Sequence, residues 1–377
     1  MSSSTHLIPA TPNTASFLAE ARAGFTADLA SPPSTARERQ ELLASIQGFA
    51  FQFLKAAAHA SHSHLEVAQT DDSPRGERDE RDSHAVEANM DPEAETDDLA
   101  RQGLNVLWGM FTSTAQVIDA ADAFHDRLVG LLAWTREFDG AYRRLHGIVG
   151  GIAGGGGWGS YGFGQSLQLA WEQLVTADLP SAAATRKSRD LAAFSARALA
   201  RGLCGGSVAG TAFWVFERAL GGNGDGDDVV SRELIPAVGV WLEHASHALL
   251  ARCCPSPAAA GLDPTTTAAM DPISRADGPS TDQVTAETQR DEFSMSNWLR
   301  WRRRLQELSH DTDADVARLA KKGFMSMIFC GRDLGVEVDG EARFAERLQG
   351  VMYRELVRSG KGVMEGEEVE IEVDWVD

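Results

Sequence analysis

The stretch RKSRDLAAFSARALARGLCGGSVAGTAFWVFERAL (residues 186–220) decides the fold class. It predicts two successive helices, Arg186–Leu203 and Ser207–Leu220. We expect further helices over Ser34–Ala60, Leu99–Phe111, Thr114–Phe138, Gln165–Thr176, Val229–Arg252, Ser294–Ser309, Asp313–Arg332 and Glu341–Arg358. Strands do not alternate with helices along the chain, which argues against a doubly wound sheet. The sequence therefore predicts an all-α fold, an irregular multi-helix bundle or helical array.

Two of these helices show the apolar spacing that predicts them. In Ser34–Ala60 large apolar side chains recur at helical intervals, and Ser34 is a candidate N-cap. They are Leu42, Leu43, Ile46, Phe49, Phe53 and Leu54. In Thr114–Phe138 an apolar stripe is formed by Val117, Phe124, Leu128, Leu131 and Leu132. Both segments are expected to pack one face against a core.

The net charge of −20 is concentrated in two short segments. Asp71–Asp98 has 12 acids and 3 bases, and Glu365–Asp377 has 7 acids and no bases, which leaves about −4 for the rest of the chain. A segment rich in charge and poor in apolar residues cannot offset its ordering entropy, so it is expected to be disordered. Binding to nucleic acid is disfavoured, because that affinity comes from clustered Lys and Arg.

These features predict six segments. They are an N-terminal helical segment (1–66), a disordered acidic insertion (67–98), the first part of the helical core (99–254), a disordered linker (255–292), the second part of the core (293–360) and an acidic tail (361–377). In the tail, apolar residues from Val369 to Trp375 alternate with acids, which is strand periodicity. It could pair with Gly335–Val338, add to a sheet edge of another protein, or remain a frayed terminus.

The chain shows neither a secretory leader nor a run of roughly 20 apolar residues that would span a membrane. Its four cysteines, Cys204, Cys253, Cys254 and Cys330, form neither a disulfide framework nor a zinc ligand pattern. We therefore expect reduced thiols, a cytoplasmic or nuclear location and no association with a membrane.

Two loop motifs resemble ligand sites. Gly154, Gly156 and Gly159 complete a G-x-G-x-x-G pattern, but the preceding AYRRLHGIVG makes a poor strand, so a loop is favoured over a dinucleotide site. GNGDGDD (222–228) resembles a calcium loop. It has Asp228 where a glycine is required and Leu234 where a glutamate is expected, so a turn is favoured.

Histidines suggest metal binding at two places, around His59, His62 and His64, and at the pair His244 and His247. Helical spacing can present two imidazoles to one ion, but no further ligands can be assigned. No nucleophile motif is present either. The sequence therefore predicts no metal, no cofactor and no catalytic residue.

Four blocks resemble a known family. They are DLAAFSARALA (190–200), TAFWVFERAL (211–220), LIPAVGVWLEHASHALL (234–250) and FSMSNWLRWRRRLQEL (293–308). They are similar to a helical family of filamentous fungi, domain of unknown function 3632, with the resemblance covering Leu99–Arg358.

In that family the first block tends to read Trp-x-Asn-Leu-Asn-Ala-Phe-Ala-Ala-Arg. Here Leu191, Ala193, Phe194, Ala196 and Arg197 match that pattern, whereas Ser188, Asp190 and Ala192 replace the Trp and both Asn residues. The resemblance implies a helical fold and leaves the function open.

Two classes of function are consistent with these features. The first is a non-enzymatic interaction or regulatory module that contacts protein partners through the tail or the tryptophan-rich helices. The alternative is an enzyme or small-molecule binder with a pocket between helices, lined by Trp214, Glu217, Trp241 and His244.

Overall fold

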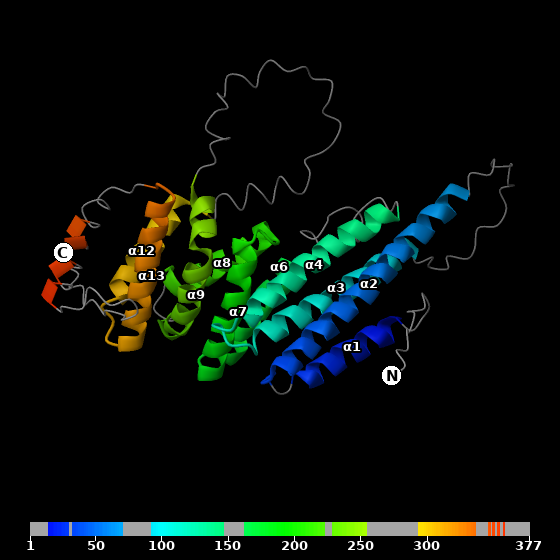
Figure 1. The fold of residues 1–377 in the computed structure, drawn as a ribbon, viewed down its shortest axis with the longest axis horizontal. Coiled ribbons are helices and arrows are strands. Elements are labelled where there is room, and N and C mark those ends of the chain that lie inside the picture. Colours follow the sequence, from blue (N-terminus) through cyan, green and yellow to red (C-terminus); the bar gives the residue numbers. More distant parts are fainter. Residues whose placement is uncertain are drawn as a thin grey trace, which may run out of the picture.

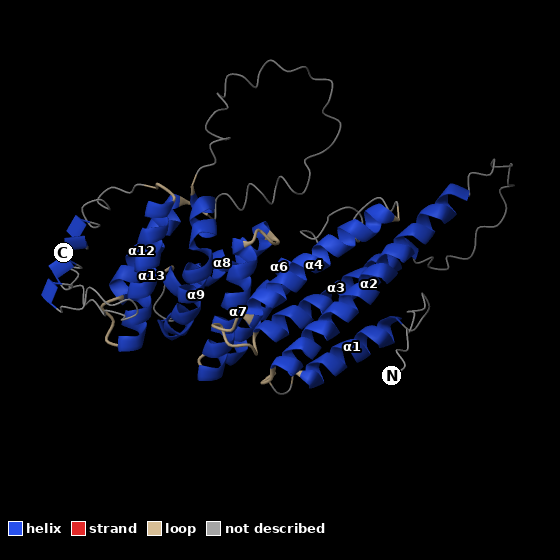
Figure 2. Cartoon of the chain, in the orientation of Figure 1, coloured by secondary structure: helices blue, strands red, loops and turns tan. Residues whose placement is uncertain are grey.

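The computed structural model describes residues 14–29, 32–70, 92–146, 162–222, 228–254 and 293–336, and the helical pairs 346–347, 349–350, 353–354 and 357–358. Within these residues there are helices and no strand (Figure 2). The elements are α1 (Thr14–Asp28), α2 (Ala36–Thr70), α3 (Pro92–Ala115), α4 (Phe124–Leu145), α6 (Phe163–Gln173), the π-helical turn η1 (Leu174–Asp178), α7 (Ala182–Ala200), α8 (Gly205–Leu220), α9 (Asp228–Cys253), α12 (Met295–Leu308) and α13 (Ala314–Asp333). The all-α prediction is confirmed.

The helices form an elongated array (Figure 1). α1 to α4 pack on one another at one end, α6 to α8 lie in the middle, and α9, α12 and α13 form the other end. α7 contacts α3 and α4 on one side and α9 on the other, so it joins the two ends. α9 packs on α7, α8, α12 and α13 and is the centre of its half.

Large aromatic side chains fill the core. Five tryptophans are almost fully buried: Trp108, Trp171, Trp241, Trp298 and Trp301. Rings from separate helices also pack edge to face, as they do where Phe163 contacts Phe194 with centroids 6.1 Å apart. The tryptophan-rich helices thus place most of their indoles inside the protein.

α9 is apolar because it is a core helix. By length and composition alone, Val229–Cys253 would be able to cross a membrane. However, 56% of its most apolar stretch is buried inside the protein, against the four helices that surround it. Packing therefore accounts for its hydrophobicity.

Side-chain caps fix the starts of several helices. At α2, Thr35 and Glu38 form a capping box: the Glu38 N–H donates to Thr35 Oγ1 (3.1 Å), and the Thr35 N–H donates to Glu38 Oε2 (3.1 Å). The cap is thus Thr35, one residue beyond the expected Ser34. Ser181, Ser294 and Asp313 cap α7, α12 and α13 in the same general way.

The prediction of one helix over Thr114–Phe138 is wrong at its start, because a turn at 116–123 separates α3 from α4. Asp119 and Asp122 accept hydrogen bonds from the Ala121 and Phe124 N–H groups, at 3.0 and 2.9 Å. Aspartate side chains that bond locally to the backbone in this way compete with helix formation. Of the apolar stripe that predicted one helix, Val117 lies in this turn and the other four residues lie on α4.

Both ends of the disordered insertion predicted over 67–98 are helical, because α2 extends to Thr70 and α3 begins at Pro92. Proline is favoured in the first turn of a helix, where its missing N–H costs nothing. The proline that suggested disorder is thus also compatible with a helix start.

Several predictions concern residues outside the described ranges. The glycine motif, the ligand positions of the calcium-like loop from Asn223 to Asp227, the side chains of His59, His62 and His64, and the acidic tail all lie there. Of the proposed strand Gly335–Val338, the structure describes Gly335 and Val336. Gly335 has a φ of 66°, and the Val336 N–H donates to the Gly331 carbonyl at 2.9 Å, so these two residues cap α13 and form no strand.

Candidate functional site

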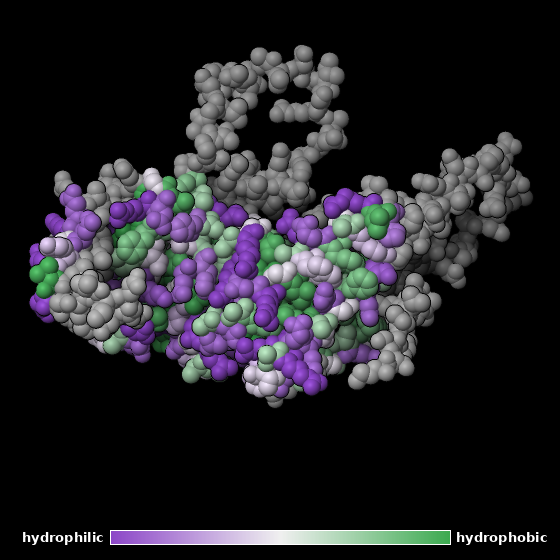
Figure 3. Space-filling model, viewed as in Figure 1, coloured by the Kyte–Doolittle hydropathy of each residue, from purple (hydrophilic) through white to green (hydrophobic). Residues whose placement is uncertain are grey.

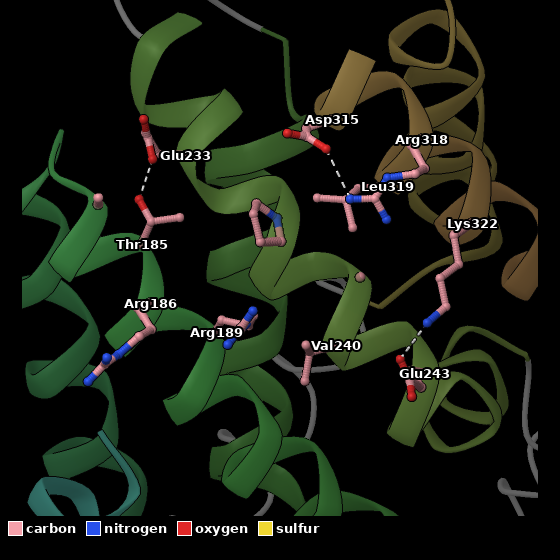
Figure 4. Close-up of a pocket in the computed structure, with 13 residues that line it drawn as sticks. Thr185, Arg186, Arg189, Glu233, Val240, Glu243, Asp315, Arg318, Leu319 and Lys322 are labelled. Atoms are coloured by element: carbon pink, nitrogen blue, oxygen red, sulfur yellow. Dashed lines mark hydrogen bonds and ion pairs between the residues drawn. The ribbon is translucent and has the colours of Figure 1, made fainter. Parts of the chain in front are cut away.

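A groove of about 660 Å³ lies between α7, α9 and α13 (Figure 4). α7 forms one wall and α13 the other, with α9 between them. The lining residues are Ala182, Thr185, Arg186 and Arg189 of α7, Glu233, Pro236, Gly239, Val240 and Glu243 of α9, and Asp315, Arg318, Leu319 and Lys322 of α13. On α7 and on α13 they are spaced three and four residues apart, so each set occupies one face of its helix.

The rims of the groove are charged and open to solvent. Six charged side chains (Arg186, Arg189, Glu243, Asp315, Arg318 and Lys322) expose between 39% and 83% of their area. Hydrophilic side chains also run across the middle of the molecule in Figure 3, with hydrophobic ones scattered between them. The groove is therefore an open trench and not an enclosed cavity.

Ion pairs arrange the charges of the α13 wall. Lys322 Nζ lies 2.8 Å from Glu243 Oε2 of α9, and the Arg318 guanidinium lies 3.1 Å from Asp315. The hydrogen bond from Lys322 is the main reason that the pKa of Glu243 is lowered, so this carboxylate is ionised at neutral pH. Exposed pairs of this kind contribute about 0–1 kcal/mol, so an incoming charged ligand can exchange with them at little cost.

The α7 wall is anchored from below by a buried acid. Asp190 is fully buried and accepts a hydrogen bond from the Ala120 N–H at 2.8 Å. Burial raises the pKa of Asp190 to about 6, although the Ala120 N–H and the nearby Arg189 and Arg186 oppose that rise. The Arg186 and Arg189 Nε atoms lie 3.8 and 3.9 Å from its carboxylate oxygens. Asp190 thus links the groove arginines to the turn between α3 and α4.

The Asp190 position is one where the family pattern has Asn. An Asn side-chain oxygen could accept the same Ala120 N–H, so the departure from the pattern changes the charge and keeps the contact. Its burial and its backbone partner indicate a structural role for this position.

The floor of the groove is small and apolar. Pro236, Gly239 and Val240 of α9 lie there, with Leu319 of α13 beside them. A Cβ atom added at Gly239 would meet no heavy atom within 4 Å. There is accordingly room above this glycine for a side chain of a bound partner.

At one end of the groove, Thr185 of α7 donates a hydrogen bond to Glu233 of α9. The same hydroxyl oxygen lies 3.1 Å from the Ser181 carbonyl, at the capped start of α7. The Glu233 carboxylate is thereby oriented at one end of the groove, and the Glu243 carboxylate lies at the other end (Figure 4).

The four residues predicted to line a pocket do not line this groove. Glu217 of α8 faces α12, where it accepts hydrogen bonds from the Trp301 indole at 2.7 Å and from Arg300. Trp214, half-buried, stacks under Arg218 at 5.8 Å. Glu217 therefore belongs to the contact between α8 and α12, whereas Trp214 contacts Arg218 of its own helix.

The other two predicted residues lie on α9. Trp241 is fully buried, and His244 is half-buried with its pKa lowered by burial and by nearby Arg197. Trp241 and His244 are thus sequence neighbours of the groove residues Val240 and Glu243 and do not line the groove themselves. The charged residues at helical spacing on α7 and α13 were the missed signal, because such spacing is also typical of an ordinary solvated face.

The histidine pair does not form a metal centre in the described structure. His247 lies 3.2 Å from Asp333 at the surface. His244 is half-buried, and the charged group that most affects its pKa is Arg197. Among the residues that the structure describes, no group of three or more His, Cys, Asp or Glu side chains could hold a metal ion.

A family model described as "Protein of unknown function (DUF3632)" matches residues 108–305. That range includes α7, α8, α9 and most of α12, so it includes two of the three helices that line the groove. No curated protein and no solved structure matches.

Proposed function

The chain belongs to the DUF3632 family, and from this premise we propose that it is a non-enzymatic interaction module whose groove between α7, α9 and α13 binds an extended polypeptide segment. The observation that carries the proposal is the open, charged trench over an apolar floor. Protein interfaces combine an apolar centre with a polar rim in this way. The tryptophan-rich helices are one contact surface expected from the sequence. Because most of the tryptophans are buried in the core, we propose the groove as the contact surface instead.

The chemistry of the groove favours a segment that carries apolar and acidic side chains. Four cations, Arg186, Arg189, Arg318 and Lys322, lie on the two walls. Three carboxylates, Glu233, Glu243 and Asp315, accompany them, which leaves one positive charge in excess. This small excess of positive charge favours an acidic segment over a basic one.

The location that fits this role is the cytoplasm or the nucleus. All four cysteines are free, and burial raises the pKa of Cys253 to about 12 and that of Cys330 to about 11. Thiols that are held neutral in this way are unreactive and suit a reducing compartment.

A peptide selection tests the proposal. A random peptide library is selected on the full chain and counter-screened on Gly239→Phe, which fills the groove above the open floor. The expected result is enrichment of acidic and apolar peptides whose Kd for Gly239→Phe is weaker by about tenfold or more, equivalent to about 1.4 kcal/mol.

Gly239→Ala is the matched control. It adds one methyl group to the same helix face, where alanine stabilises a helix by roughly 0.5–1 kcal/mol relative to glycine. Binding should therefore persist in this variant. An absence of enriched peptides, or equal affinity for the Phe variant and the parent protein, would contradict the proposal.

A small-molecule binder is the second candidate. The groove volume of about 660 Å³ falls in the range of roughly 300–1,000 Å³ that is typical of ligand pockets. The half-exposed rims favour a polypeptide, because pockets usually enclose a small ligand. A thermal-shift screen with metabolites and nucleotides separates the two, since a ligand that binds only the folded state raises its melting temperature.

A further inference from the structure

The tail carries the apolar and acidic side chains that the groove is proposed to bind. Residues 365–377, EGEEVEIEVDWVD, contain seven acids and no base. From Val369 to Trp375 apolar residues alternate with acids, so an extended conformation would present one apolar edge and one acidic edge. The groove offers an apolar floor at Pro236 and Val240 between two cationic walls.

Resting on the function proposed above, we propose that this tail occupies the groove of its own chain. The apolar edge, with Ile371 and Val373, lies on the α9 floor. The acids face outward, where the long side chains of the wall arginines and of Lys322 fold over them. A partner segment must then displace the tail, so the tail regulates access to the groove.

The connecting chain is long enough for this contact. Lys322 lies eleven residues before the end of α13, a distance of about 17 Å along the helix. Twenty-eight residues (337–364) separate Val336 from the tail. Even if all of them were helical they would extend about 42 Å, which is more than the return path requires.

The energetic requirement is modest. A tethered segment experiences an effective concentration in the millimolar range, so a weak contact suffices to keep the groove occupied. The pairs that the tail would exchange, Lys322 with Glu243 and Arg318 with Asp315, are exposed. Exchange with tail carboxylates therefore costs little.

Carbodiimide cross-linking of the full chain tests the contact. The reagent joins amines to adjacent carboxylates, so Lys322 should become linked to Glu370, Glu372 or Asp374 within one chain, as identified by mass spectrometry. The native link from Lys322 to Glu243, at 2.8 Å, is an internal control for reactivity.

Two variants keep every tail carboxylate and should remove the tail cross-links. Gly239→Phe fills the groove, and the double variant Ile371→Ser with Val373→Ser removes the apolar edge of the tail. Both should retain the link from Lys322 to Glu243. The double variant should also bind a library-selected peptide about fivefold more tightly, if the tail occupies the groove in about four of five molecules.

The outcomes separate this inference from the function on which it rests. If selected peptides bind the groove but the tail forms no links to Lys322, the inference fails and the proposed function stands. Links that join two chains would overturn an intramolecular contact in favour of a second copy. If no peptide binds in any variant, the proposed function fails as well.

Discussion

Asp190 and His125 hold the turn between α3 and α4 from two sides. Asp190 accepts the Ala120 N–H at 2.8 Å, and His125 Nε2 lies 3.2 Å from the Ile118 carbonyl, to which it can donate. Both side chains are fully buried. Burial raises the pKa of Asp190 from 3.8 to about 6 and, together with Arg197, lowers the pKa of His125 from 6.5 to about 4. Burial therefore shifts both groups toward their neutral forms, although Asp190 is still largely ionised at neutral pH, which lies above its pKa.

These two shifts act in opposite directions on stability. Between about pH 4 and 6 folded Asp190 binds a proton that the unfolded chain has lost, so its contribution falls as the pH rises. Over about pH 4 to 6.5 the unfolded chain protonates His125 and the folded chain does not, so that contribution falls as the pH drops. At 1.36 kcal/mol per pKa unit, the Asp190 contribution amounts to at most about 3 kcal/mol and the His125 contribution to at most about 3.4 kcal/mol.

In each single variant, the free energy of unfolding should change with pH in the direction set by the buried group that remains. From pH 4 to 6.5 the free energy of unfolding of Asp190→Asn should rise with pH more steeply than that of the parent, and that of His125→Gln should rise less steeply or fall. Urea unfolding followed by circular dichroism across this range measures both. A difference between parent and Asp190→Asn that stays constant with pH would contradict the raised pKa.

At the scale of the helix, α13 depends on one cap for the wall that it contributes to the groove. Asp313 Oδ1 accepts the Asp315 and Val316 N–H groups at 2.9 and 3.3 Å. Asp313→Ala should lower the free energy of unfolding by ~1 kcal/mol, because two N–H groups lose their acceptor. Asp313→Asn keeps an oxygen at the cap and is the matched control. Urea midpoints that drop equally in both variants would show that the cap itself is not responsible.

Most helix positions could be predicted from apolar spacing, but α1 and the α3–α4 turn could not. α1 buries few large side chains, chiefly Leu18 and Phe25, so it lacks a clear stripe. The turn depends on Asp190, which lies 70 residues further along the chain and accepts the Ala120 N–H. Local periodicity contains no information about such a distant partner.

The groove was harder to predict than the fold for the same reason. Arg318 and Lys322 occupy one face of α13, and Arg186 and Arg189 occupy one face of α7. Each face resembles a solvated helix surface in the sequence. Only the packing of both helices on α9 shows that the faces converge.

Considered as a whole, the molecule builds its groove from two parts of the chain. Two of the groove helices, α7 and α9, precede residues 255–292, whereas α13 follows them. The later part, α12 and α13, is attached through buried apolar side chains that include Trp298, Trp301 and Met327. Burial of that much apolar surface favours association whether or not the two parts share a backbone.

The groove should therefore be reconstituted by fragment complementation. Residues 1–254 and 293–377, produced as separate polypeptides, are expected to associate on mixing and to elute together in size-exclusion chromatography. A groove-selected peptide should bind the mixture and neither fragment alone, because each fragment lacks part of the lining. Binding to 1–254 alone would show that α13 is dispensable. Ligand binding in this protein would then report on the assembly of two pieces, as in a split reporter.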